Sequence, residues 1–498
     1  MMVHVPSVSA LVGQHDHGRA TPVAKKRPAE KDRFVKATWI LFGGVLVAYL
    51  FTATYAIGRV PINDTFFTAF PAYTLGKLGT LNIDAVMNYT DRGWAFIQDG
   101  HLRSDRFPGA ILIAAPFYAI AGGGQFSLGP SAVVAALTTA TAVALLHRTL
   151  LRIVGLRTAT GGALLFAFGT AAWTVAADGL WTHGPTLMGL SLASWALGSE
   201  RFAIAGLGYA LAILSRPHTA IVAAIAGTWQ AISSRSWRPI VLIGSTSVLG
   251  LVGLLAYNRV NAGSWDIFPG SYGGRFEAAT SVGDGGQAKP GVWAGDIFAT
   301  LLSPARGALF LSPFLLLAVP GLIGAWRRAP VWVRSSVGGA VAYLVIQLAG
   351  NTWIGATGIF GNRLVLESLL LSAPLLALSW EIWGARRVWA VRVMAVFAFL
   401  SVWWFAVASV VAAVDLGAID PAPRWTKWAV PQAVTAAGPA VWAGAAALAG
   451  FVIWLIGRIE QSDLPSSAGA VSATPPVVDP RDRGTPASGG VKKKTRHR

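Results

Sequence analysis

Asp64 combines a reactive side chain with a position in the chain that suggests chemistry. It lies in the segment 61–65 (PINDT), directly after the first long apolar run, at the height where a lipid headgroup would meet water. A carboxylate placed there can act as a general base toward a substrate hydroxyl. The alternative is structural, because Asn and Asp are favoured N-caps and a helix is expected to follow. The local sequence leaves both interpretations open.

A second segment brings an acid, a tryptophan and a histidine close together. Asp178 and His183 flank Trp181 in a short loop that is expected on the same side of the membrane as Asp64. The carboxylate and imidazole can bind sugar hydroxyls or assist proton transfer, while the indole can stack on a pyranose face. The alternative is a belt of interfacial tryptophan with solvated neighbours.

Three arginines lie at the outer ends of apolar runs, against the usual inward bias of positive charge. They are Arg216, Arg306 and Arg363. A planar guanidinium binds a phosphate through two parallel hydrogen bonds, so these side chains could hold a lipid phosphate. The alternative is that each is a snorkelling arginine paired with a loop acid.

The elements that must position these residues are membrane-spanning helices. Hydrophobic residues make up 54% of the chain and charged residues 12%, more apolar surface than a soluble core of this size can bury. The sequence predicts an all-α polytopic membrane protein with about 12 transmembrane helices, since its apolar runs are about 17–25 residues long. The expected spans are 37–58, 128–147, 158–177, 184–199, 202–215, 217–233, 238–257, 308–326, 335–350, 364–383, 391–414 and 439–457.

The distribution of charge predicts which loops face the cytoplasm. The net charge is +18, but the basic residues are scattered over short loops and both tails, which is typical of membrane orientation rather than of nucleic-acid binding. Alternate loops are arginine-rich and are expected to be cytoplasmic, as are both termini. The other loops carry most of the acids and are expected to face outward: Asp64, Asp84, Asp91, Asp99, Asp105, Asp178, Asp266, Glu277, Asp284, Asp296, Asp415 and Asp420.

Three regions follow from this pattern. Residues 1–36 form a basic cytoplasmic tail, residues 37–457 the transmembrane domain, and residues 458–498 a disordered tail rich in Pro, Ser, Ala and Gly. The outer segments 59–127 and 258–307 are too long for simple connections and are expected to carry function. Within the first, 65–81 is amphipathic, and 108–124 is better suited to lie at the interface than to cross.

Several classes of chemistry are excluded by what the sequence lacks. It contains no cysteine, so thiolate metal sites, disulfides and cysteine nucleophiles are ruled out. It also lacks a P-loop, a dinucleotide-binding glycine loop and an HExxH motif. The expected cytoplasmic loops are too short for a nucleotide-sugar domain, so a donor would have to be reached from outside or from the bilayer.

The loop motifs resemble those of a known superfamily over residues 37–380. The chain looks like the GT-C superfamily of polyprenyl-phosphate-sugar-dependent glycosyltransferases, in particular the protein-mannosyltransferase-like branch, glycosyltransferase family 39. The first outer loop carries the clearest similarity, and short motifs later in the chain fit the same pattern. The matched segments are 63–64 (ND), 70–72 (FPA), 78–84 (LGTLNID), 104–109 (SDRFPG), 115–118 (APFY), 180–185 (LWTHGP), 214–217 (LSRP), 303–307 (SPARG), 311–314 (LSPF), 353–355 (WIG) and 360–363 (FGNR).

The resemblance implies roles for the candidate residues. Asp64 would be the catalytic base of an inverting hexosyl or pentosyl transfer at the outer face, and segment 104–127 would be a juxtamembrane helix. Because a carboxylate at a wet interface keeps a near-normal pKa, we expect Asp64 to act as an ionised base. The family often has two adjacent acids where this chain has Asn63, which leaves open single-carboxylate catalysis or a non-catalytic homologue. We expect no metal ion, although a divalent cation is not excluded. The expected substrate-binding residues are Asp105, Arg106, Asp178, Trp181, His183, Arg216, Arg306 and Arg363.

The sequence thus favours a membrane glycosyltransferase that uses a polyprenyl-phosphate-linked sugar. Its acceptor would be the hydroxyl of a lipid, a glycan or a protein, its location a bacterial inner or plasma membrane, and its partners would include membrane lipids but no nucleic acid. Two rivals stay open: a transporter or lipid flippase, and a non-catalytic membrane scaffold subunit.

Overall fold

The computed structural model describes residues 28–56, 63–87, 94–268, 290–350, 358–411 and 425–459. The described residues all belong to one compact unit, residues 26–463. The predicted tails lie largely outside the described residues, as do Asp415, Asp420, the centre of the second outer segment and the motif at 353–355. The first helix begins at Pro28, earlier than the predicted span.

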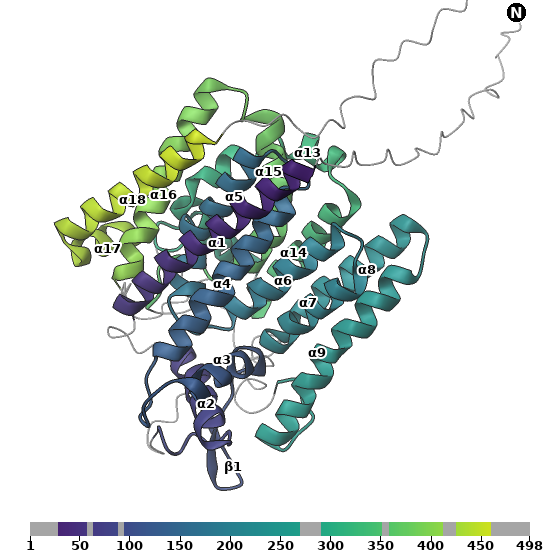
Figure 1. Cartoon of the computed structure of the whole chain (residues 1–498), viewed down its shortest axis with the longest axis vertical. Coiled ribbons are helices and arrows are strands. Elements are labelled where there is room, and N and C mark those ends of the chain that lie inside the picture. Colours follow the sequence, from purple (N-terminus) through teal and green to yellow (C-terminus); the bar gives the residue numbers. More distant parts are fainter. Residues whose placement is uncertain are drawn as a thin grey trace, which may run out of the picture. The chain divides into compact units, whose positions relative to one another are not determined.

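The described part of the chain is dominated by helices (Figure 1). Seven of them are long and apolar enough to cross a membrane, which confirms the prediction of an all-α polytopic membrane protein. The predicted number of spans stays a prediction. The seven are α1 (Pro28–Ala56), α4 (Gly129–Leu150), α9 (Arg238–Ala262), α14 (Val331–Gly350), α15 (Leu366–Trp383), α16 (Val388–Val410) and α18 (Pro439–Arg458).

The four predicted spans between α4 and α9 correspond to shorter helices. Predicted span 158–177 is α5 (Leu156–Phe168) followed by a π-helix (Ala172–Ala177), and α6 (His183–Leu197) takes the place of span 184–199. The chain then forms α7 (Phe202–Ser215), a 3₁₀ turn (Pro217–Thr219) and α8 (Ala220–Ser234). The helix breaks at Arg216 because the residue before a proline disfavours the helical conformation.

The predicted single span over 308–326 is wrong. It consists of α12 (Ala308–Leu311), a 3₁₀ helix (Pro313–Ala318) and α13 (Leu322–Arg328), preceded by α11 (Pro290–Leu302). Pro313 and Pro320 interrupt the helix because proline has no N–H to donate. The break is fixed by the Ser312 hydroxyl, which donates to the Gly169 carbonyl at 2.6 Å.

Several long helices carry large apolar side chains on exposed surface. An apolar surface of this size is unfavourable in water and suits a hydrocarbon environment. The outermost helices are therefore the ones that face lipid. The exposed residues include Trp39, Ile40, Val47 and Phe51 on α1, Val241, Leu249 and Val260 on α9, Trp389 and Val396 on α16, and Phe451 and Trp454 on α18.

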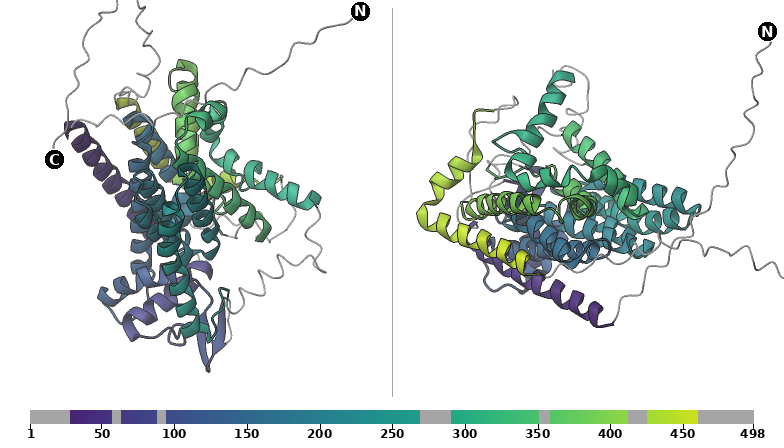
Figure 2. Two further views of the ribbon diagram at one scale, coloured as in Figure 1. Left: turned by 90° about the vertical axis from the view of Figure 1, so that its right-hand side faces the viewer. Right: turned by 90° about the horizontal axis from the view of Figure 1, so that it is seen from above.

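The helices pack closely where glycines face one another. A Cβ on Gly189 of α6 would lie 2.5 Å from the Gly208 carbonyl oxygen of α7, and a Cβ on Gly208 would lie 2.6 Å from the Gly189 carbonyl oxygen. Small residues let helix backbones approach in this way in membrane proteins. Around this pair α4 packs against α1 and α6, α7 against α9, and α14 against α8 and α15, while α18 lies along α16 (Figure 2).

The first outer segment forms a small layer at one end of the helices (Figure 1). It contains α2 (Asn63–Leu78), the antiparallel hairpin β1 (Ala95–Gln98) and β2 (His101–Ser104), and α3 (Pro108–Ile120). With 13 residues, α3 is about 20 Å long, too short to cross the hydrocarbon core, in keeping with its predicted interfacial place. The hairpin was not predicted.

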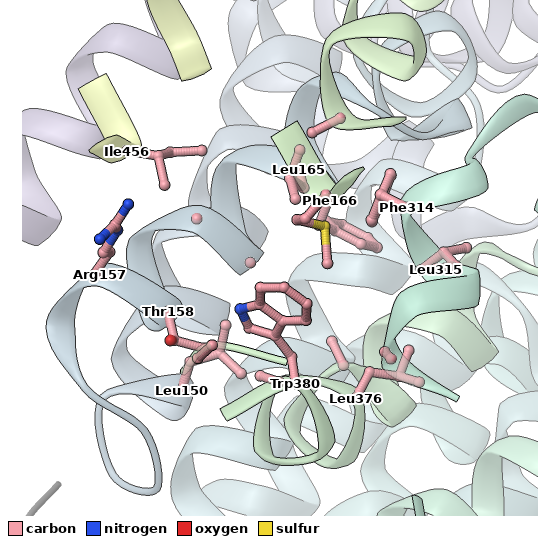
Figure 3. A pocket seen from close by; sticks show the side chains of 18 of the residues that line it. Leu150, Arg157, Thr158, Leu165, Phe166, Phe314, Leu315, Leu376, Trp380 and Ile456 are labelled. Atoms are coloured by element: carbon pink, nitrogen blue, oxygen red, sulfur yellow. The ribbon is translucent and has the colours of Figure 1, made fainter. Parts of the chain in front are cut away.

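A cavity of about 330 Å³ lies among α5, α15, α16 and α18 (Figure 3). A further short helix, α17 (Ala429–Ala437), packs against α16 and α18.

Candidate active site

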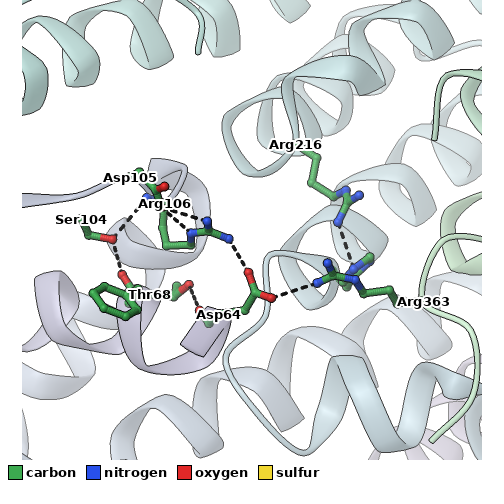
Figure 4. A network of polar contacts seen from close by, with 9 residues as sticks. Asp64, Thr68, Ser104, Asp105, Arg106, Arg216 and Arg363 are labelled. Carbon is green, nitrogen blue, oxygen red and sulfur yellow. Dashed lines mark hydrogen bonds and ion pairs between the residues drawn. The ribbon is translucent and has the colours of Figure 1, made fainter. Parts of the chain in front are cut away.

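Asp64 lies in the first turn of α2 between two arginines (Figure 4). Arg106 Nη1 donates to Asp64 Oδ1, and Arg363 Nη1 donates to Asp64 Oδ2 at 3.2 Å. The Asp64 side chain is only 14% exposed. Both arginines come from other elements, so the carboxylate joins the first outer segment to the segment before α15 and is more than a helix cap.

The charges around Asp64 fix its protonation. Burial by itself would raise the pKa of the carboxyl, but the positive charges of Arg363 and Arg106 outweigh it and lower the pKa below its usual value. The near-normal pKa expected from the sequence is therefore wrong, because the carboxylate is buried against two guanidinium groups rather than placed at a wet interface. Asp64 is ionised at neutral pH.

The hairpin holds Arg106 in place. Asp105 Oδ1 accepts from Arg106 Nε at 2.9 Å, and the guanidinium carbon lies 4.3 Å from the centre of the Trp94 ring. The Asp105 backbone N–H donates to the Trp94 carbonyl at 3.1 Å, while Asn261 of α9 donates to the Ser104 carbonyl at 2.8 Å. These two hydrogen bonds fix the end of β2. The Arg106 side chain, which follows β2 in the chain, therefore points toward Asp64.

A close backbone contact brings this loop to Arg216. A Cβ on Gly109, in the first turn of α3, would lie 2.1 Å from Ser215 Oγ and 2.8 Å from Ser215 N. Only glycine allows this approach. Because Arg216 follows Ser215 at the end of α7, the contact sets the spacing between the 104–107 loop and Arg216.

Trp181 forms one wall of the site. Its ring centre lies 4.8 Å from the Arg363 guanidinium carbon, and the side chain is 3% exposed. His183, two residues along at the start of α6, is fully buried. The alternative of an interfacial tryptophan belt with solvated neighbours is therefore wrong here, because Arg363 and the start of α6 enclose the indole.

A buried polar network continues from His183. His183 Nδ1 lies 2.7 Å from Glu367 Oε1, and Arg216 Nη1 lies 2.9 Å from His183 Nε2. Arg216 also donates through Nε to the Tyr343 hydroxyl at 2.9 Å and through Nη2 to Gln347 Oε1 at 2.7 Å. Arg216 is thus paired across the bundle with helix residues rather than with a loop acid.

Sequence reasoning missed Glu367, Tyr343 and Gln347. The signal for Glu367 was present, because it is an ionisable residue inside the predicted span 364–383 and such residues mark functional or paired positions. Tyr343 and Gln347 lie four residues apart on α14, on one helix face. Nothing in the sequence alone connects that face with Arg216.

Arg306 lies beside Arg363. It is 2% exposed, and its pKa is lowered to about 9, first by burial and then by the charge of Arg363. Two guanidinium groups that repel each other in a buried place are stabilised by an anion between them. Around the site Arg106, Arg216, Arg306 and Arg363 outnumber the carboxylates of Asp64, Asp105 and Glu367.

Asp178 lies apart from this cluster. Its Oδ1 atom is 3.1 Å from the Thr52 hydroxyl of α1, and burial raises its pKa well above the usual value despite the hydrogen bond from Thr52. The structure thus directs Asp178 toward α1, while the other sequence-predicted residues gather around Asp64 or in the adjoining network. Those residues are Asp105, Arg106, Trp181, His183, Arg216, Arg306 and Arg363.

No group of three His, Asp or Glu side chains suited to hold a metal ion occurs in the described ranges. The site brings together the ionised carboxylate of Asp64, an arginine cluster and a buried indole.

Comparison with known proteins gives a structural similarity but no match at the level of sequence. No family model matches the sequence, and no curated protein matches it. The structure is similar to the crystal structure of ArnT from Cupriavidus metallidurans bound to undecaprenyl phosphate, at 13% sequence identity and a TM-score of 0.45. The match covers 87% of this chain and 77% of that chain.

Proposed function

We propose that this chain is a membrane glycosyltransferase that moves a sugar from a polyprenyl phosphate to an acceptor hydroxyl at the outer membrane face. The observation that carries the proposal is the ionised carboxylate of Asp64, held between Arg106 and Arg363 beside the buried Arg306. A base next to an arginine cluster suits a reaction in which a proton is removed and a phosphate departs. The loop motifs of the sequence point to the same chemistry.

In the proposed step Asp64 takes the proton of the acceptor hydroxyl. The acceptor oxygen attacks the anomeric carbon, and the bond from that carbon to the phosphate oxygen breaks. The electron pair leaves with the polyprenyl phosphate, whose charge is held by Arg363 and Arg306. The proton remains on Asp64, and attack opposite the leaving group inverts the anomeric configuration.

Arg363 would bind both the proposed base, Asp64, and the phosphate of the donor. It donates to Asp64 at 3.2 Å and stacks on Trp181. A donor phosphate near Arg306 competes for the Arg363 guanidinium, because its anionic oxygens can accept two parallel hydrogen bonds from an arginine. Donor binding would thus draw Arg363 from Asp64 and raise the basicity of the carboxylate when the donor is in place.

The distribution of arginine among the loops supports the proposed location. With arginine-rich loops on the cytoplasmic side, the layer that contains α2, α3 and the hairpin faces outward, and both termini are cytoplasmic. An inner or plasma membrane supplies both the lipid donor and access to acceptors outside the cell. The transferred group is a hexosyl or pentosyl unit, and the acceptor is a lipid, a glycan or a protein.

The test is sugar transfer by purified protein. Radiolabelled sugars on synthetic polyprenyl phosphates are offered with extracted lipid, glycan and protein acceptors, to wild type and to Asp64→Asn. We expect transfer by wild type and a loss of at least about 100-fold in Asp64→Asn, the usual contribution of a general base. Asp99→Asn is the matched control, because Asp99 is exposed at the hairpin tip.

Transfer that persists in Asp64→Asn would remove Asp64 as the base. Absence of transfer from every donor, in wild type with an intact thermal transition, would overturn the proposed activity.

A transporter or flippase is the second candidate. It is favoured by the buried group of Glu367, His183 and Arg216, since ionisable residues inside spans often line transport pathways. Liposomes that contain the protein and a fluorescent polyprenyl phosphate separate the two candidates. Movement of the lipid between leaflets without sugar transfer would assign the chain to transport.

A further inference from the structure

Figure 3 shows the cavity among α5, α15, α16 and α18, and none of its lining residues belongs to the candidate active site. Glu367 is near the start of α15 and belongs to the network beside Asp64, whereas Trp380 lines the cavity near the end of the same helix. The 13 residues between them correspond to about 20 Å of helix. Leu369, two residues beyond Glu367, also lines the cavity, so the cavity extends along α15 from near this network to Trp380, toward the opposite membrane face.

Each helix contributes one continuous stripe to the cavity wall. On α5 the lining residues are spaced four apart, which places them on one helix face, and α15 and α16 show similar spacings. The cavity is thus a long space shared by several helices. The stripes are Arg157, Thr158, Gly161, Gly162, Leu165 and Phe166 on α5, Leu369, Ala373, Leu376, Ala377 and Trp380 on α15, and Val391, Met394, Ala395 and Ala398 on α16.

Glycines on α5 help to keep this space open. A Cβ on Gly161 would lie 3.4 Å from Ile456 Cγ2 of α18, and a Cβ on Gly162 would lie 3.2 Å from Leu150 Cδ1. Larger side chains at these positions would extend toward α18 or α4. Water gains little from such an apolar space, because it finds few polar partners there.

The polar groups of the cavity concentrate at one end. Arg157 and Thr158 lie at the start of α5, and the Thr158 hydroxyl donates to Glu381. Arg157 is half-buried and makes no hydrogen bond or ion pair with any residue in the described ranges. The exposed Arg386 and Arg392 adjoin the lining residues Ala385 and Val391. This end is therefore basic, while the rest of the lining is apolar except for Thr170, whose hydroxyl donates to the Phe166 carbonyl at 2.5 Å.

We propose that the cavity binds an acyl chain of an anionic membrane phospholipid, with the lipid phosphate at Arg157. The apolar stripes match a hydrocarbon chain, and the basic rim of Arg157, Arg386 and Arg392 matches a negative headgroup. The donor phosphate proposed above belongs to Arg363, at the other end of α15. The cavity is thus a second lipid site, on the face expected to be cytoplasmic, where anionic headgroups and basic residues meet.

The test measures lipid retention rather than sugar transfer, so it is independent of the proposed activity. Full-length protein is taken from nanodiscs of equal phosphatidylglycerol and phosphatidylcholine into detergent, and bound lipids are counted by native mass spectrometry. Wild type should retain one phospholipid, with at least a fivefold preference for phosphatidylglycerol.

Two variants separate the acyl chain from the headgroup. Gly161→Leu fills the cavity and should lower retention at least tenfold, whereas Gly244→Leu, at an α9 glycine with nothing within 4 Å of a Cβ, should retain the lipid. Arg157→Gln should abolish the preference for phosphatidylglycerol, whereas Arg328→Gln, at an exposed arginine that does not line the cavity, should keep it.

Three outcomes would overturn the proposal. One is a folded wild type that retains no phospholipid. Another is retention and headgroup preference that are the same in Arg157→Gln as in wild type. The third is a polyprenyl phosphate retained in this cavity in protein from native membranes and lost in Gly161→Leu, which would assign the space to the donor. Because Arg157→Gln changes a half-exposed side chain, it keeps the test decisive if Gly161→Leu does not fold.

Discussion

At the scale of single residues, Asp64 and Arg363 form an ion pair in the candidate site. The ion pair lowers the pKa of Asp64, which keeps the carboxylate charged but makes it a weaker base. A folded-state pKa below the usual value contributes stability above that usual value, and the contribution is lost as the pH falls through the lowered pKa. The pair is thus both a structural contact and a control on reactivity.

The acid limb of the pH profile of kcat/KM should depend on the ion pair between Asp64 and Arg363. In Arg363→Gln the largest charge that lowers the Asp64 pKa is gone while burial remains, so the pKa rises. The limb of kcat/KM, which requires the ionised base, should move to higher pH than in wild type. Arg328→Gln is the control and should leave the limb in place. An unmoved limb in an active Arg363→Gln variant would show that Asp64 is not the titrating base.

Glu367 should matter more for stability than any exposed acid. Glu367→Gln leaves Arg216 and His183 buried without their negative partner, and breaking a buried ion pair costs about 3–5 kcal/mol. Thermal unfolding in detergent measures the effect. Glu200→Gln, at an exposed turn, should change stability by less than about 0.5 kcal/mol. Equal thermal midpoints for the two variants would contradict the role given to the buried network.

The sequence was enough to predict several of the candidate site residues, but it did not predict which residues they contact. Position relative to the apolar runs is enough to find Asp64, Arg216 and Arg363, because a span ends where the apolar run ends. The pairing of Asp64 with Arg363 is a contact across 299 residues, and no local spacing encodes such a contact. Glu367 could be recognised in the sequence as a charged residue inside an apolar run. Its contacts with His183 and Arg216 could not be recognised there.

At the scale of elements, the hairpin and the start of α3 act as the frame of the site. Asp99 and Gly100 at the hairpin tip have φ angles of 51° and 77°, which suits the Asp-Gly signal of a tight two-residue turn. That signal was present in the sequence between two short alternating segments, and it was missed because the surrounding apolar runs favour helices. The helix breaks at Pro313 and Pro320 could also have been predicted from the sequence. The high hydropathy of the segment led instead to the prediction of one continuous span.

Gly109 should tolerate no side chain. In Gly109→Ala the new Cβ would meet Ser215 at 2.1 Å from Oγ and 2.8 Å from N, so α3 or the end of α7 must shift. We expect a loss of about 1–3 kcal/mol of stability, together with reduced transfer because Arg106 and Arg216 separate. Thermal unfolding and the transfer assay measure the two effects.

Gly122→Ala is the matched control, since a Cβ there would have nothing within 4 Å. If both alanine variants behave like wild type, the close approach of α3 to α7 does not set the geometry of the site.

At the scale of the whole molecule, the direction of insertion follows from charge and can be measured directly. The chain has no cysteine, so single cysteines can be introduced without background. Asp99→Cys at the hairpin tip should react with a membrane-impermeant maleimide in intact cells, whereas Ser236→Cys between α8 and α9 should react only after permeabilisation. The reverse pattern would place the candidate site on the cytoplasmic side and rule out the proposed donor route.

The contact between Asp64 and Arg363 also has a consequence for biosynthesis. Its two partners are 299 residues apart, and a ribosome that adds about 5–20 residues per second needs roughly 15–60 s to make that length. Throughout that interval α2 exists without the arginine that joins it to the segment before α15. A nascent chain interrupted before residue 363 therefore carries the proposed base but not the site, and the proposed activity requires that nearly three quarters of the 498 residues have been made.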